Sequence, residues 1–208
     1  MKRSLLSLLI SLSAVGGEFV NLDFNGPDLR APMEPLLPGG PYLGRTSDLL
    51  PGWTIQVGGE VASQVTYSPI QKTSFGPVTL RQNSATDAAG PLGFGSLQLH
   101  SPVPPAPEIR LSQRGTIPAD AAGLWIANAG LLQTFINGEM IEDPNVGTFG
   151  HTIDISRYAG QEVNLEFLVL PGASIRFDIL GFVPVPEPET WALLSVGLGI
   201  LLWFGRRK

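Results

Sequence analysis

Short runs of alternating apolar and polar residues, separated by turn signals, dominate the body of the chain. In EIRLSQRG (108–115), Ile109, Leu111 and Gln113 alternate with charged and hydroxyl side chains. SIRFDILGFV (174–183) repeats the pattern near the end of the body. Successive side chains of a strand point to opposite faces of a sheet, so each run predicts a strand with one buried face.

A hairpin signal and a proline-rich bridge organise these strands. Asn137-Gly138 separates two β-rich runs, and both residues tolerate the positive φ of a type I′ turn. SPVPPAP (101–107) has too many prolines for a central strand and is expected to bridge two parts of a sandwich. Without a helical period before Trp191, the chain is expected to be an all-β, antiparallel β-sandwich of jelly-roll type. Strands are expected at 19–24, 53–57, 64–67, 78–80, 95–100, 108–115, 123–128, both arms of 131–141, the stretch ending at Ile155, 163–170 and 174–183.

The charges are distributed unevenly along the 208 residues. Residues 17–185 contain 8 Lys/Arg and 16 Asp/Glu, a net charge of −8, whereas five of the 13 basic residues lie at the two ends of the chain. Nucleic-acid binding needs clustered Lys and Arg to contact phosphates, so the acidic body argues against it. The chain has no cysteine, which excludes disulfides, thiolate nucleophiles and Cys-based zinc sites.

The first 16 residues have the order of a secretory signal peptide. Lys2 and Arg3 are followed by an apolar stretch from Leu5 to Val15 and then by small residues. Such a segment directs export and is removed afterwards. The alternative is a buried first strand or helix of the domain, but nothing in the predicted domain needs these residues.

The chain ends on a short apolar segment followed by three basic residues. Trp191–Phe204 would form a helix of about 21 Å at about 1.5 Å per residue, whereas a hydrocarbon core is about 30 Å thick. The segment is therefore barely adequate as an anchor, and its basic end should stay cytoplasmic. The residues expected in the membrane helix are Trp191, Ala192, Leu193, Leu194, Leu198, Leu201, Leu202, Trp203 and Phe204, with Arg206, Arg207 and Lys208 as the stop-transfer signal.

A proline strip precedes the apolar segment. Each proline disfavours helix at the residue before it, so VPVPEPE should be extended and accessible to a processing enzyme. An ordinary linker ahead of a permanent single-pass anchor is the alternative. The order of Pro186-Glu187-Pro188, the apolar run containing glycines and the terminal Arg206-Arg207-Lys208 resembles a PEP-CTERM sorting signal.

This resemblance implies export by a Gram-negative-type bacterium, recognition by an exosortase membrane protease and removal of the tail. It also implies a transient stay at the inner membrane and delivery to the cell surface or an exopolysaccharide matrix. Pro186, Glu187 and Pro188 would carry the recognition. The body more loosely resembles galactose-binding-like jelly-roll domains, in the segments FVNLDFN, LLPGWTI, LSQRGTIPADAAGLWI, FINGEMI, DISRYAGQEVNLEF and IRFDILGF. The expected organisation is a signal peptide at 1–16, a β-sandwich domain at 17–183 and a sorting and anchor segment at 184–208.

The body offers little that predicts catalysis. His100 and His151 are the only histidines, and neither a G-x-S-x-G elbow nor an H-E-x-x-H motif occurs. Glu139, Glu142 and Asp143 cluster at a hairpin end, where they are expected to form a solvated loop edge rather than a glycosidase acid pair. We therefore expect a non-enzymatic protein.

Two binding sites remain open from the sequence. Asn21, Asp23, Asn25 and Asp178 carry the hard oxygen ligands that calcium prefers, although such residues also form turns. No other cofactor is expected. For a sugar ligand, the stacking candidates are Trp53, Tyr67, Trp125 and Tyr158, although aromatics in strands usually belong to the core.

The sequence thus predicts an exported surface or matrix protein with a structural or adhesive role. The alternatives are a carbohydrate-binding module that recognises exopolysaccharide and a permanently anchored membrane protein.

Overall fold

A computed structural model describes residues 17–22, 24, 27–38, 40–69, 76–82, 95–101, 107–143 and 150–185. The predicted signal peptide (1–16) and everything after Val185 lie outside these residues. So do the side chains of residues 82, 95, 128, 129, 178 and 179.

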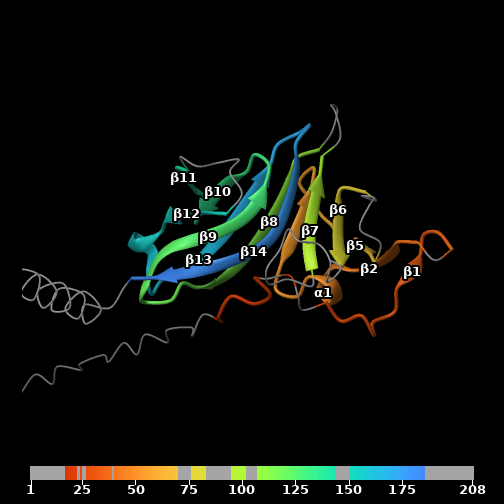
Figure 1. The fold of residues 1–208 in the computed structure, drawn as a ribbon, viewed down its shortest axis with the longest axis horizontal. Helices are drawn as coiled ribbons and strands as arrows, with labels where there is room; N and C mark the ends of the chain where they lie inside the picture. Colours follow the sequence, from red (N-terminus) through yellow and green to blue (C-terminus); the bar gives the residue numbers. More distant parts are fainter. Residues whose placement is uncertain are drawn as a thin grey trace, which may run out of the picture.

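Two β-sheets form the body (Figure 1). The larger, eight-stranded sheet has the order β1 (Glu34–Pro35), β2 (Tyr42–Arg45), β5 (Gln64–Ser68), β6 (Val78–Gln82), β7 (Gly95–His100), β14 (Ser174–Pro184), β9 (Ala121–Ala129) and β12 (His151–Asp154). The smaller, six-stranded sheet has the order β11 (Glu139–Ile141), β10 (Gln133–Ile136), β13 (Glu162–Val169), β8 (Ile109–Thr116), β3 (Thr54–Val57) and β4 (Glu60–Val61). Two short helical turns, α1 (Thr46–Leu49) and η1 (Ser156–Tyr158), complete the described elements. The strands predicted between residues 53 and 183 are confirmed, whereas β1, β2 and β4 were not anticipated.

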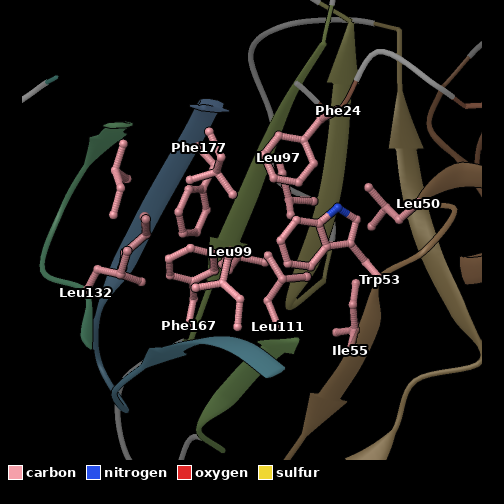
Figure 2. Packing of buried hydrophobic residues seen from close by; sticks show 14 of the residues in the cluster. Phe24, Leu50, Trp53, Ile55, Leu97, Leu99, Leu111, Leu132, Phe167 and Phe177 are labelled. Atoms are coloured by element: carbon pink, nitrogen blue, oxygen red, sulfur yellow. The ribbon is translucent and has the colours of Figure 1, made fainter. Parts of the chain in front are cut away.

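The core lies between the two sheets. Alternate residues of β8 are buried, including Ile109, Leu111 and Gln113 as the alternation predicts. Phe167 of β13 and Phe177 of β14 meet across the sandwich with ring centroids 5.2 Å apart, and both side chains are fully buried (Figure 2). Trp53 belongs to the same aromatic cluster, with its ring centroid 6.2 Å from that of Phe167. Full burial of a large apolar side chain contributes about 1.5–3 kcal/mol to the stability of the folded state.

The predicted hairpin is confirmed at β10–β11. Ile136 pairs with Glu139 across a two-residue loop. Asn137 has a φ of 53° and Gly138 a φ of 80°, the positive values that a type I′ turn requires. The turn also receives support from β13, since Asn164 N–H donates to the Asn137 side-chain oxygen at 2.8 Å.

The described residues depart from a purely antiparallel arrangement at β5–β6 and at an isolated parallel bridge between Glu18 and Thr116. β5 and β6 run parallel, while the other described strand pairs are antiparallel. The strands that flank the proline-rich segment 101–107 lie in different sheets, β7 in the larger and β8 in the smaller. This agrees with the prediction that the segment bridges two parts of a sandwich.

The predicted strand at 19–24 is wrong for the residues described there. Asn21 and Phe24 have φ values of 53° and 54°, in the left-handed region, which interrupts extended backbone. The Val20 N–H donates to the side chain of Gln113 rather than to the backbone of a neighbouring strand. The Leu22 carbonyl accepts the Leu180 N–H from β14 at 2.9 Å. The apolar alternation here belongs to residues outside the strands, of which Phe24 is fully buried and Val20 is exposed.

Candidate functional site

The end of β14 leads directly into the predicted sorting segment. β14 lies in the interior of the larger sheet, between β7 and β9, and ends at Pro184, which pairs with Ala121. Val185 N–H then donates to the Asp120 carbonyl at 2.7 Å. The folded body is therefore held in place up to the residue before Pro186.

The sorting residues themselves lie outside the described part of the chain. This applies to Pro186, Glu187 and Pro188, and to the predicted membrane and stop-transfer residues from Trp191 to Lys208. Among the described residues, no helix combines the length and apolar character needed to cross a membrane. The roles of these residues stay predictions from the sequence.

Only some of the residues predicted to bind calcium lie in the described part of the chain. Asn21 is described, and its carbonyl accepts the Trp53 indole N–H at 3.1 Å. Asp23 and Asn25 lie outside the described residues, and Asp178 lies in β14 with its side chain outside them. No group of three or more His, Asp or Glu side chains suited to a metal occurs within the described ranges. A calcium site here stays a prediction.

The four aromatic candidates for sugar stacking separate into two groups. Trp53, Tyr67 and Tyr158 are buried, with 5%, 6% and 8% of their surface exposed. The Arg157 guanidinium lies over the Tyr158 ring, 4.7 Å from its centroid. Trp125 differs because it is only half-buried. Its neighbours Leu124 and Ile126 point into the core with no exposed surface, which turns Trp125 to the outer face of the larger sheet.

The surroundings of Trp125 are built from small residues. Thr152 of β12 and Gly181 of β14 are its direct partners on the two adjacent strands. A side chain added at Gly181 would meet open space, whereas one added at Gly150 would contact the Trp125 ring at 3.6 Å. Trp125 is thus the least buried of the four candidates, and Trp53 lines a surface hollow beside α1 and β3.

The acidic cluster after the β10–β11 hairpin divides between surface and interior. Glu139 accepts the Tyr158 hydroxyl at 2.9 Å and pairs with Arg157 at 2.8 Å, and these contacts lower the pKa of its carboxyl, the Tyr158 hydrogen bond most. Glu142 is exposed. These two residues fit the predicted solvated edge.

Asp143 does not fit that prediction. Its side chain is only 9% exposed and lies 2.6 Å from His151 Nε2, whose side chain is 5% exposed. The prediction of a solvated Asp143 is therefore wrong, because His151 on β12 provides a buried partner that local sequence does not reveal. The pair ties the chain after β11 to the edge strand of the opposite sheet.

Two surface hollows accompany these groups. One, of about 420 Å³, lies beside β11 and η1 and is lined by Glu139, Met140, Ile141, Glu142, Asp154, Ser156 and Arg157. The other, of about 500 Å³, lies beside α1 and β3 and includes Arg45, Ser63 and Gln64. Both can offer hydrogen bonds to polar ligands. In the first, the Asp154 carboxylate already accepts the Ser156 N–H at 2.9 Å, and Glu139 is held by Arg157.

Residues 184–208 match the PEP-CTERM protein-sorting motif. The match covers the tail and begins at the last residue of β14. This motif implies exosortase-dependent export and sorting, with processing at the membrane. None of the curated proteins matches the chain.

Several solved structures match the chain weakly. The enzymatically active domain of bacteriophage CBA120 tailspike protein 4 is 16% identical, with a TM-score of 0.35 over 64% of this chain and 19% of that one. The β-D-glucuronidase of Dictyoglomus thermophilum is 15% identical, with a TM-score of 0.32 over 65% of this chain and 21% of that one. The β-glucosidase of Kluyveromyces marxianus is 13% identical, with a TM-score of 0.32 over 58% and 16%. The chain spans about a fifth of the length of these structures.

Proposed function

We propose that this protein is exported through residues 1–16, held briefly in the inner membrane by Trp191–Phe204 and released by an exosortase that recognises Pro186-Glu187-Pro188. The observation that carries the proposal is the match of residues 184–208 to the sorting motif. The fold supports it, since the buried core residues lie between Phe24 and Leu180, ahead of the matched tail. Removal of the tail would leave the core of the sandwich intact.

The body, a sandwich of the jelly-roll type, then acts as a structural or adhesive component of the cell surface or matrix. Its edge strands support a discrete unit: β1 and β4 have two residues each, β11 three and β12 four. Short edge strands restrict pairing with strands of other chains. Adhesion would therefore use side chains on the faces and ends of the sandwich rather than added strands.

Replacement of Pro186, Glu187 and Pro188 by alanine in the native cells tests the sorting proposal. Mass spectrometry of the surface fraction should find the wild-type protein without Arg206–Lys208, and the variant retained in the inner membrane with these residues present. The matched control replaces Glu34 and Pro35, an exposed Glu-Pro pair in β1, by alanine. Normal maturation and destination of the triple variant would refute the proposal.

A second candidate function, binding of exopolysaccharide, is favoured by the half-buried Trp125 on the outer face of the larger sheet. Aromatic rings offer an apolar face that fits the apolar face of a sugar ring. Mature protein from the native cells should then bind the polysaccharide at millimolar sugar, and Trp125→Ala should abolish binding. Met140→Ala, which truncates another accessible apolar side chain, is the control. Equal binding by both variants would exclude Trp125 as the site.

A further inference from the structure

Both ends of the described body lie at one end of the sandwich. β8 ends at Thr116, whose N–H donates to the Gly17 carbonyl at 3.0 Å. Four residues later the Asp120 carbonyl holds the Val185 N–H at 2.7 Å. We call this the β8–β9 end, defined by Gly17, the turn 116–121, Pro184 and Val185. Both segments that the sequence directs to the membrane therefore leave from the same place.

The opposite end lies at the far side of β9. The strand runs from Ala121 to Ala129, and the turn that follows contains Gly130 and the exposed Leu131. We call this turn the β9–β10 end. At about 3.3 Å per residue, the two ends of β9 are about 26 Å apart.

The connection to the predicted membrane segment is shorter than the sandwich. Trp191 follows Val185 by six residues, which can span about 20 Å at most. A connection of this length cannot pass along the body and place the β9–β10 end between the body and the bilayer. An inverted arrangement of the tethered protein is thereby excluded.

Charge argues against a body that lies flat on the bilayer. Residues 17–185 have a net charge of −8, so the body as a whole is not attracted to anionic lipid. The proline strip itself favours an extended exit, because Pro184, Pro186 and Pro188 occupy alternate positions after an interior strand.

We infer that the membrane-held form stands on its β8–β9 end, with the β9–β10 end directed away from the bilayer. This inference rests on the proposed function, since it needs the tail in the membrane. Its consequence is a division of the surface: the processing protease must work within about 20 Å of the bilayer, beside the β8–β9 end. The β9–β10 end and the faces of the sheets stay available to partners outside.

Single cysteines can test the orientation, because the chain contains none of its own. Asp120→Cys and Leu131→Cys place a fluorophore at exposed turn positions on either side of β9. The anchored form, with its tail retained by expression without the protease, is placed in vesicles whose headgroups carry nitroxide quenchers. Quenching of the label at 120 should be at least about twofold stronger than quenching of the label at 131, because the positions are about 26 Å apart along β9.

A spacer variant provides the matched control. Twelve Gly/Ser residues inserted after Val185 form a flexible coil that lets the body rotate, so the difference between the two labels should disappear. Equal quenching without the spacer, or stronger quenching at 131, would overturn the orientation while leaving sorting unaffected. Failure of the protein to float with vesicles would instead refute the membrane-held state in the proposed function, and the orientation with it.

Discussion

The side chain of Gln113 holds the backbone of Val20 at both polar groups. Val20 N–H donates to Gln113 Oε1 at 2.9 Å, and Gln113 Nε2 donates to the Val20 carbonyl at 3.0 Å. The two residues are 93 positions apart, and only 4% of Gln113 is exposed. This side chain takes the place of a strand partner at Val20, after the isolated parallel bridge that Glu18 forms with Thr116.

We expect Gln113→Leu to destabilise the protein by about 1–3 kcal/mol, because the part-buried backbone groups of Val20 lose their partners. Urea unfolding, followed by tryptophan fluorescence, measures the change in the free energy of unfolding. Gln64→Ala, at an exposed position of β5, should stay within about 0.5 kcal/mol of wild type. Equal stability of the two variants would mean that Val20 is satisfied in another way.

Substitutions at the two residues of the β10–β11 turn should differ in how much they destabilise the protein. Gly138→Val places a β-branched side chain at a φ of 80° and should cost about 1–2 kcal/mol. Asn137→Gly keeps the positive φ of that position but loses the acceptor for Asn164 N–H, so its cost should be smaller, about 0.5–1.5 kcal/mol. Thermal unfolding of both variants tests this order, and a cost of Asn137→Gly above that of Gly138→Val would contradict the type I′ geometry.

The buried pair Asp143–His151 should contribute more to the free energy of unfolding than the exposed Glu142 beside it. Asp143→Ala leaves His151 without its 2.6 Å partner in a site where its side chain is 5% exposed. We expect a loss of about 1–3 kcal/mol in chemical denaturation. Glu142→Ala, one residue earlier and exposed, should have little effect. A similar small effect of both substitutions would show that the pair is dispensable for the fold.

Glu139 should make stability depend on pH in the acid range. The Tyr158 hydroxyl and then Arg157 lower the pKa of Glu139 below its usual value of 4.5. A lowered folded-state pKa gives a contribution that is complete above pH 4.5 and is lost as pH falls through the folded-state pKa. The difference in unfolding free energy between wild type and Glu139→Gln should therefore shrink from pH 6 to pH 3. A difference that is constant across this range would contradict the ion-pair geometry.

Patterns among neighbouring residues of the sequence predicted much of the fold. The alternation in 108–115 and 174–183 predicted β8 and β14, and Asn137-Gly138 predicted a turn whose φ values have the required sign. These features are encoded in neighbouring residues, because the period of two and the positive φ are properties of the backbone itself. The same patterning failed at 19–24, where Gln113 and Leu180 supply the backbone partners from distant strands.

By itself, the sequence determined the strand-rich body, the acidic surface, and the order of sorting motif, apolar run and basic end in residues 184–208. Only the tertiary structure decided that Trp125 faces outward, that Asp143 is buried against His151, and that Gly17 and Val185 lie at the same end of the sandwich. The physical reason is that composition and periodicity depend on neighbouring residues. Which strands become neighbours, and what covers a given side chain, depends on contacts between residues far apart in the chain.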